Sequence, residues 1–138
     1  MIVLDTNVLS ALMRTEPDAS VLAFLDRQDP SSVWITAVTV FEVRFGLHRL
    51  AAGRRRRALE AAFEQLVADD LDHRVLGFDA SAAAHAAQLA AAREAAGRPV
   101  DLRDTWIAGI VAARGATLIT RNLRHFRDLD VRVVDPWA

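Results

Sequence analysis

Four oxygen-bearing side chains in this sequence are expected near the carboxyl ends of strands or in the adjoining turns of helices. They are Asp5, Glu42, Asp104 and Asn122. In an open parallel α/β sheet, ligands bind outside the carboxyl ends of the strands, at the crevice where the strand order reverses. Carboxylates gathered there repel one another unless cations neutralise them. The pattern therefore predicts a site for Mg²⁺, with Mn²⁺ as an alternative, because both ions prefer oxygen ligands.

A metal centre of this kind suits phosphodiester cleavage, because the ion lowers the pKa of an attacking water and stabilises the leaving oxygen. The chain offers no covalent nucleophile paired with a base and no GxxxxGK[ST] phosphate-binding loop. The four histidines show no metal-ligand spacing, and we assign them structural or surface roles. They are His48, His73, His85 and His125.

Each candidate also has a purely structural interpretation. Asp5 can be a turn former at the end of a strand, and we favour Asn7 as the cap of the following helix. Glu42 stands among apolar neighbours, where an unpaired carboxylate is costly, so Arg44 or Arg49 is a candidate partner.

Asp104 has two interpretations that depend on its helix. With Asp101 as the N-cap, it lies in the first turn, where a negative charge favours the helix dipole. Ile107, Ala108 and Val111 follow three, four and seven residues later, so Asp104 lies on the packed stripe of the helix. We therefore interpret Asp101 as the cap and Asp104 as a site residue.

Composition favours one globular domain over residues 1–138, since a chain of this length with 52% hydrophobic residues buries roughly two-thirds of its unfolded surface. There is no Cys, so a metal must be held by oxygen or imidazole ligands. The formal net charge of −1 argues against nucleic-acid binding through a global basic field. No apolar run approaches the ~20 residues of a membrane span, and no basic segment precedes the first apolar run, so we expect a cytoplasmic protein.

Short apolar runs, often β-branched, alternate with helical patterns along the chain. We expect strands at residues 1–4, 33–35, 75–78, 117–120 and 131–134. We expect helices at residues 7–14, 17–28, 36–50, 54–70, 79–96 and 101–114. Uninterrupted apolar strands are typical of a parallel sheet covered on both faces. The predicted fold class is therefore α/β, a three-layer α/β/α domain with a short central parallel sheet.

Four segments carry a resemblance to a known family. They are LDTNVLSAL at 4–12, TAVTVFEVRFGL at 36–47, DTWIAGIVAARGATLITRN at 104–122, and the terminal VVDPW. In order, spacing and total length they resemble the PIN-domain family, and in detail its VapC and FitB-type toxins, over essentially the whole chain.

The resemblance implies a metal-dependent endoribonuclease, the toxin of a toxin–antitoxin pair restrained by a cognate VapB-like antitoxin. Carried over residue by residue, the acidic metal ligands of the family fall on Asp5, Glu42 and Asp104, the positions that the residues themselves suggest. Four polar residues match the surroundings of that site and are assigned to substrate binding. They are Thr6, Asn7, Thr120 and Arg121.

The fourth acidic position of FitB-type members falls on Asn122, and the place three residues later, often Asp in similar sequences, is His125. An amide can donate a carbonyl ligand or orient a water, so Asn122 keeps a place among the catalytic candidates. It removes one negative charge, however. We therefore predict one firmly held cation, with a second recruited, if at all, by RNA phosphate.

Apolar residues such as Leu12, Phe41 and Phe45 exceed what the neighbouring helices need. The resemblance implies that such surface serves a homodimer and antitoxin docking, while core packing explains the same residues equally well. The basic run at 54–57 has two interpretations, RNA phosphate binding and a solvated helix start, and charge runs favour the second.

Two further classes remain as alternatives. One is a non-catalytic PIN fold that binds RNA or protein, which the amide at Asn122 makes conceivable. The other is a phosphoacceptor receiver, which needs a Lys, and this chain has none. Within nucleases, the sequence does not distinguish RNA from DNA as substrate.

Overall fold

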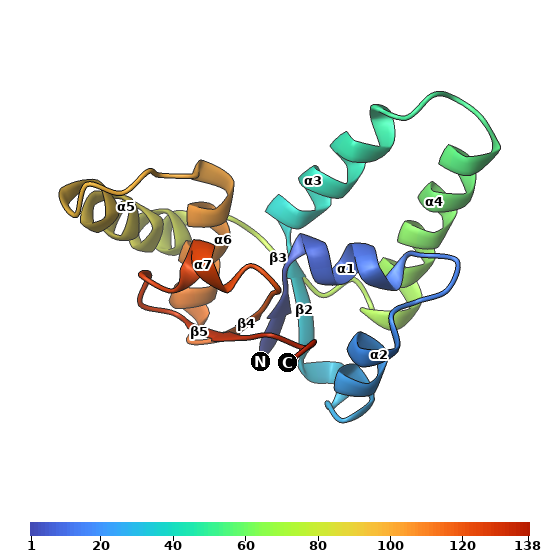
Figure 1. Ribbon diagram of the computed structural model, residues 1–138, viewed down its shortest axis with the longest axis horizontal. Coiled ribbons are helices and arrows are strands. Elements are labelled where there is room, and N and C mark those ends of the chain that lie inside the picture. Colours follow the sequence, from blue (N-terminus) through green and yellow to red (C-terminus); the bar gives the residue numbers. More distant parts are fainter.

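The computed structural model describes all 138 residues and contains one sheet of five parallel strands in the order β3-β2-β1-β4-β5 (Figure 1). The strands are β1 (Ile2–Leu4), β2 (Val33–Thr36), β3 (Val75–Leu76), β4 (Thr117–Ile119) and β5 (Arg132–Val134). The first strand is central and pairs with β2 on one side and β4 on the other. The strand order therefore reverses at β1, and the crevice expected of a parallel sheet lies beside its carboxyl end.

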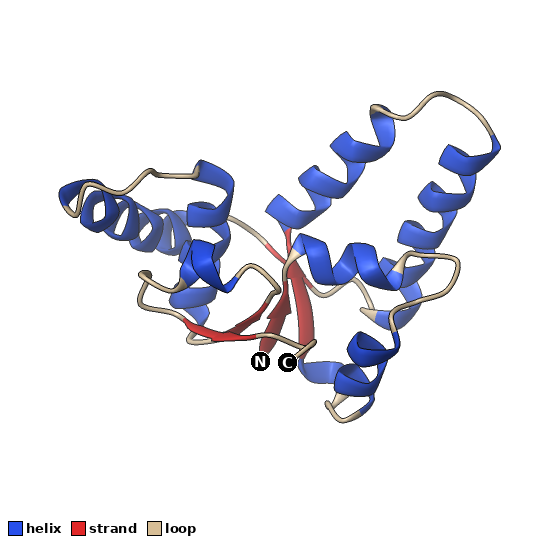
Figure 2. Cartoon of the chain, viewed as in Figure 1, coloured by secondary structure: helices blue, strands red, loops and turns tan.

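Helices cover both faces of this sheet, which confirms the predicted three-layer α/β fold (Figure 2). One side carries α1 (Thr6–Leu12), α2 (Ala19–Asp26), α3 (Ala37–His48) and α4 (Arg54–Gln65). The other side carries α5 (Ala80–Ala95), α6 (Leu102–Arg114) and the short α7 (Leu123–Phe126). A 3₁₀ turn, η1 (Pro30–Ser32), precedes β2, and a π-helical turn, η2 (Leu66–Asp70), extends α4. None of the helices has the length and apolar character needed to cross a bilayer.

The core has two parts because successive side chains of a strand point to opposite faces. Leu4 and Ile119 belong to the buried cluster beneath α1 to α4, whereas Val3 and Leu118 belong to the cluster beneath α5 to α7. Strands β1 to β4 therefore contribute apolar side chains to both layers, whereas β5 contributes only Val133, to the second cluster. This explains why the strands are uninterrupted apolar runs rather than alternating ones.

Two predictions about the first helix are wrong. Its N-cap is Asp5, whose side chain accepts a hydrogen bond from the backbone N–H of Thr6, and Asn7 lies inside the helix. The helix also ends at Leu12 rather than at Arg14. The carboxylate of Asp5, directly after β1, caps the helix where the strand ends, so the first turn begins two residues earlier than a cap at Asn7 would allow.

Other predicted boundaries also differ from the structure. The α-helical part of 54–70 stops at Gln65 and continues as the π turn η2, and β3 has two residues rather than four. The helix α7 was not predicted, since four residues are too few for an apolar period to be visible.

Helices α5 and α6 approach each other closely at Gly109 of α6. A Cβ atom added there would lie 2.7 Å from the carbonyl oxygen of Ala82 and 2.7 Å from Cβ of Ala86 on α5. The absence of a side chain therefore allows α5 and α6 to pack directly against each other, and α6 is the helix that carries Asp104.

Candidate active site

Asp5 is the first residue after β1, and its carboxylate is almost fully buried, with 4% of the residue exposed. Both carboxylate oxygens accept hydrogen bonds. Oδ1 accepts from the backbone N–H of Thr6 at 2.8 Å, and Oδ2 accepts from the Thr120 hydroxyl at 2.7 Å and from the Asn7 amide at 3.2 Å. The carboxylate of Asp5 is therefore held in one orientation by groups from two elements.

Thr120 follows β4, the strand beside β1, and is completely buried. Its hydroxyl donates to Asp5 and accepts from the Asn7 amide at 3.1 Å and from the Asn122 backbone N–H at 3.0 Å. The side-chain oxygen of Asn7 in turn accepts from the backbone N–H of Arg121 at 3.2 Å. Three residues assigned to substrate binding, Asn7, Thr120 and Arg121, thus join the carboxyl ends of the two central strands.

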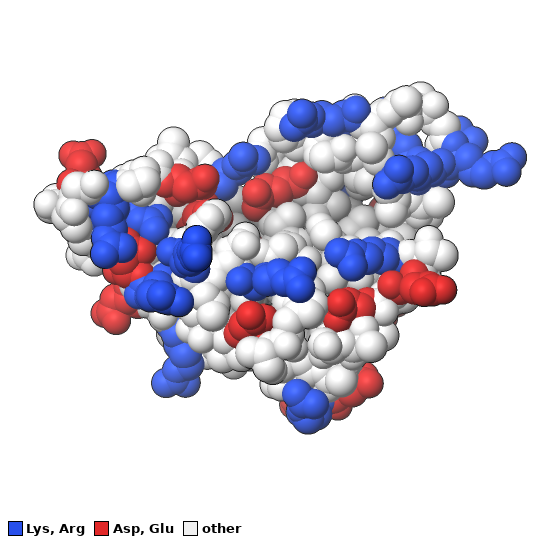
Figure 3. All heavy atoms as spheres, viewed as in Figure 1, with Lys and Arg blue, Asp and Glu red and all other residues white.

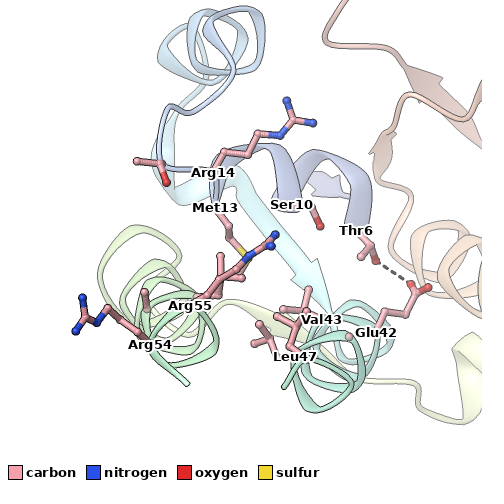
Figure 4. Close-up of a pocket in the computed structure, with 14 residues that line it drawn as sticks. Thr6, Ser10, Met13, Arg14, Glu42, Val43, Leu47, Arg54 and Arg55 are labelled. Carbon is pink, nitrogen blue, oxygen red and sulfur yellow. Dashed lines mark hydrogen bonds between the residues drawn. The ribbon is translucent and has the colours of Figure 1, made fainter. Parts of the chain in front are cut away.

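Glu42 lies on α3 and faces the start of α1. One of its oxygens accepts a hydrogen bond from the Thr6 hydroxyl at 2.8 Å (Figure 4). The other lies 3.8 Å from the guanidinium of Arg103 on α6. Arg44 and Arg49, the expected partners, instead place their guanidinium groups over aromatic rings. The prediction of Arg44 or Arg49 as partner is wrong, because Arg44 reaches Phe63 on α4 and Arg49 lies over Phe45.

Asp104 lies in the first turn of α6, where Asp101 caps the helix by accepting from its backbone N–H at 3.0 Å. The predicted cap is therefore confirmed. Asp104 Oδ2 lies 2.8 Å from Nδ1 of His125, on α7. An ionised carboxylate only accepts hydrogen bonds, so the imidazole is the donor. His125 was assigned a structural or surface role, and the structure places it in the site instead.

The electrostatics of the three carboxylates indicate a crowded negative site. Burial raises the pKa of Asp5, and the negative charge of Asp104 adds to this, while the hydrogen bonds from Thr120 and Thr6 oppose it. Burial likewise raises the pKa of Glu42, to which Asp5 contributes repulsion. The pKa of Asp104 is raised by burial and by Asp101, against the hydrogen bond from His125. The pKa of each of these three carboxylates is thus raised in part by the negative charge of another.

Arg121 and Asn122 directly follow Thr120 and lie at the exposed rim of the site. Asn122 is exposed and precedes α7 without capping it through its side chain. The guanidinium of Arg121 stacks on the ring of Trp137, 4.4 Å from its centre. The Trp137 indole N–H donates to Asp18 at 3.0 Å. The terminal VVDPW segment therefore supports the rim of the site.

A groove of about 890 Å³ opens beside Glu42, between α1, α3 and α4 (Figure 4). Thr6 and Glu42 line its inner end, and its apolar wall includes Met13 and Leu47. Its remaining charged lining consists of arginines, which are Arg14, Arg54 and Arg55. Arginine side chains also gather over the outer ends of α3 and α4 on the molecular surface (Figure 3). We call this feature the arginine groove.

The donor set fits a hard divalent cation in its chemistry. Three carboxylates with raised pKa values repel one another, and a cation relieves that repulsion. No three acidic or imidazole side chains converge closely enough to enclose an ion by themselves. Mg²⁺ does not need such a cage, because it keeps several waters and commonly takes one or two carboxylates together with substrate phosphate.

Comparison with known proteins finds one matching family and relatives that are similar over nearly the whole chain. A family model described as the PIN domain matches residues 2–132. The chain is 39% identical to a VapC ribonuclease, Y4jK, of Sinorhizobium fredii, over 99% of this chain and 98% of the relative. It is 34% identical to toxin FitB of Neisseria gonorrhoeae, over 99% of both chains.

The fold agrees with solved structures of the same group. The crystal structure of FitAcB from Neisseria gonorrhoeae superposes with a TM-score of 0.89 at 34% identity, over 99% of each chain. A further match, at 28% identity and a TM-score of 0.68 over 96% of each chain, is described as a member of the VapBC family of toxin–antitoxin systems from Mycobacterium tuberculosis.

Proposed function

Since this chain belongs to the PIN-domain family, among the VapC and FitB toxins of VapBC toxin–antitoxin systems, we propose that it is an endoribonuclease that uses a divalent metal ion. Its relatives include VapC ribonucleases matched over nearly the full length of the chain. The observation that supports this activity best is the grouping of Asp5, Glu42 and Asp104, each with a raised pKa, beside the strand-order reversal at β1.

These three carboxylates would bind the ion either directly or through the waters that it keeps, with Mg²⁺ expected and Mn²⁺ possible in its place. The chemistry available from such an ion, when bound, would be a lower pKa for an attacking water and neutralisation of charge on the leaving oxygen. The protein's own contribution is orientation. Thr120 and the Thr6 backbone fix the carboxylate of Asp5, and the Thr6 hydroxyl holds Glu42 toward it. Because these donors are tied to β1, β4 and α1, they hold the ligands without needing to rearrange.

The expected number of tightly held ions depends on Asn122, which stands at the fourth acidic position of FitB-type members. Asn122 contributes no charge there, and Asp104 already shares one oxygen with His125. We propose one firm cation, with a second recruited only by an RNA phosphate. Titration of the free protein with Mn²⁺, followed by electron paramagnetic resonance, should give one tight site, and two tight sites without RNA would contradict this.

We propose that the RNA strand enters through the arginine groove. Backbone phosphates supply much of the affinity of proteins for nucleic acid, and Arg14, Arg54 and Arg55 line a groove whose inner end is Thr6 and Glu42. This local concentration of cations accounts for RNA binding by a chain whose net charge is −1. It also changes the interpretation of the basic run, since two of its four arginines line the groove.

The partners would be a cognate antitoxin and a second copy of the chain. Relatives are described as members of toxin–antitoxin systems. Phe41 and Phe45 stack on each other at 5.7 Å and are about half exposed on α3, while Phe78 and Trp106 are exposed and 5.8 Å apart near α6. We propose that a homodimer covers these aromatics in the cytoplasm. Light scattering should find a dimer that Phe41→Asp converts to a monomer.

The decisive experiment compares wild type with Asp5→Asn on RNA and on single-stranded DNA, each with Mg²⁺ or Mn²⁺. Wild type should cleave RNA only when metal is present, and Asp5→Asn should be reduced to background, because the buried ligand loses its charge. The matched control is Asp72→Asn. Asp72 precedes the amino end of the edge strand β3, whereas Asp5 follows the carboxyl end of the central strand β1, and the φ of 47° at Asp72 is one that Asn tolerates well.

Each outcome of that comparison decides something. RNA cleavage that survives in Asp5→Asn contradicts the proposed site. Absence of cleavage by wild type, with RNA still bound, favours a non-catalytic PIN domain, for which the amide at Asn122 is the motivating feature. Cleavage of DNA in preference to RNA would contradict the proposed substrate class.

A further inference from the structure

His125 occupies a part of the site that the proposed ligand set does not use. It lies on α7, which has only four residues and cannot be stable alone. The next residue, Phe126, is completely buried in the cluster beneath α5 to α7 and anchors this short helix. The imidazole itself is 55% exposed, so burial does not fix it.

A bidentate ion pair between Arg93 and Asp128 holds the backbone of His125 against α5. Arg93 on α5 donates to both carboxylate oxygens of Asp128, at 3.0 and 2.8 Å, and to the carbonyl oxygen of His125 at 2.9 Å. The side chains of Arg93 and Asp128 are only 9% and 14% exposed. A bidentate contact between arginine and a carboxylate is among the stronger hydrogen-bonded pairs in proteins. We call the contact between these two side chains and the His125 carbonyl the α5–α7 brace.

The brace and the imidazole act on one carboxylate. With its carbonyl held by Arg93, His125 presents Nδ1 to Oδ2 of Asp104 at 2.8 Å. This contact leaves Oδ1 as the oxygen of Asp104 that makes no side-chain hydrogen bond. An exposed His–Asp pair alone contributes little to stability. The contact is therefore better explained by the direction it gives to the carboxylate than by what it adds to folding.

We propose that His125, held by the α5–α7 brace, is a positioning residue that orients Asp104 to receive a divalent cation through Oδ1. This inference rests on the proposed function, since it takes Asp104 as a metal ligand. Groups that hydrogen-bond to a metal ligand typically change metal affinity by about 10- to 100-fold when they are removed. The brace extends this effect to Arg93, whose sequence position lies 32 residues from His125 and whose side chain touches none of the carboxylates of the site.

The test measures Mn²⁺ binding to the metal-free protein by calorimetry, without RNA, so that it does not depend on cleavage. His125→Ala should weaken Mn²⁺ binding about 10-fold. His125→Asn should restore most of the affinity, because the Asn side-chain amide places an N–H donor close to where Nδ1 of the imidazole lies. The rescue separates orientation of Asp104 from a general loss of packing, since thermal unfolding should change little in either variant.

Two further variants complete the series. Arg93→Lys keeps the charge but loses the bidentate contact, and should weaken Mn²⁺ binding in the same direction by a smaller factor. His85→Ala is the matched control, because His85 is a partly exposed histidine whose ring hydrogen-bonds to the Ser81 carbonyl of its own helix and to none of the carboxylates. It should bind Mn²⁺ as wild type does.

The outcomes separate this inference from the proposed function. If Asp104→Asn loses Mn²⁺ affinity while His125→Ala retains it, the positioning role is wrong and the metal site stands. If His125→Asn falls as far as His125→Ala, the Nδ1 donor is not the cause and the role is again wrong. If neither wild type nor Asp104→Asn binds Mn²⁺, the proposed metal site itself fails.

Discussion

The two sides of the site hold their carboxylates in different ways. On the side of β1, Asp5 is 4% exposed and accepts hydrogen bonds at both oxygens, from Thr6, Asn7 and Thr120. On the side of α6, the Asp104 side chain is 17% exposed and accepts one side-chain hydrogen bond, from a histidine that is itself mostly exposed. The first side is fixed locally, and the second depends on contacts made elsewhere.

Solvent explains this difference. Hydrogen bonds in a buried site are strong because water does not compete for them, so a few short side chains suffice around Asp5. At a partly exposed carboxylate water does compete, and position must come from more rigid parts of the fold. For Asp104 these parts are the cap of α6, the close packing at Gly109 and the α5–α7 brace. The buried side is thus sensitive to the loss of one polar atom, and the exposed side to the loss of packing.

Replacement of Thr120 by Val should have the largest effect, because it removes a buried hydroxyl that joins Asp5, Asn7 and the Asn122 backbone. We expect unfolding to become easier by about 1–3 kcal/mol, measured in urea, since buried polar groups lose their partner. The pKa of Asp5 should rise further, because the Thr120 bond lowers it. As the pH is lowered, cleavage by Thr120→Val should therefore be lost at a higher pH than cleavage by wild type. Thr120→Ser, which keeps the hydroxyl, should restore the pH profile. A wild-type profile in Thr120→Val would contradict the inference that local hydrogen bonds hold Asp5.

Replacement of Gly109 by Ala tests the packing on the other side. The new Cβ would lie 2.7 Å from backbone and side-chain atoms of α5, so the helices must separate. We expect a loss of about 1–3 kcal/mol in urea unfolding, which exceeds the gain of about 1 kcal/mol in helix propensity. Hydrogen exchange should accelerate in α5 and α6 and not in α1. Gly46→Ala on α3 meets no atom within 4 Å and serves as the control. Uniform acceleration across the chain would show that the two sides are not independent.

The smallest effect concerns pH and stability without metal. Burial raises the folded-state pKa of Asp5 above its unfolded value, so ionisation of Asp5 opposes folding at pH values above the folded pKa. This penalty disappears as the pH falls through the folded pKa toward the unfolded one. Metal-free Asp5→Asn should therefore resist urea better than wild type at pH 7, with the advantage shrinking in acid. Asp104→Asn should gain less, because it also weakens the contact with His125. Asp5→Asn less stable than wild type at pH 7 would contradict the assignment of a strained, buried charge.

The sequence allowed the fold and three corners of the site to be predicted because both depend on local patterns. Strand ends located Asp5, and the packed stripe of α6 located Asp104. The alternation of short apolar runs with helices predicted the parallel sheet, which the structure confirms. The metal-binding roles of these residues remain predictions.

The parts that could not be predicted depend on contacts between distant segments. His125 lies in a helix of four residues, and the contact that brings its imidazole to Asp104 involves Arg93, on another helix. Arg103 on α6 faces Glu42 on α3, whereas spacing along the sequence favoured Arg44 or Arg49 as the partner of Glu42. The sequence signal that points to His125 as a site residue is its position, at which similar sequences often carry an acid.

The hydrogen bond between Thr120 and Asp5 joins residues 115 positions apart. Contacts of such long range form late in folding, because the entropy of closing a large loop must be overcome first. A nascent or partly unfolded chain therefore lacks the orienting hydroxyl of its buried carboxylate, even when α1 and α3 have formed. A nuclease built in this way becomes competent only when the first and fourth strands have paired, so that damage or incomplete folding yields an inactive molecule rather than a less selective one.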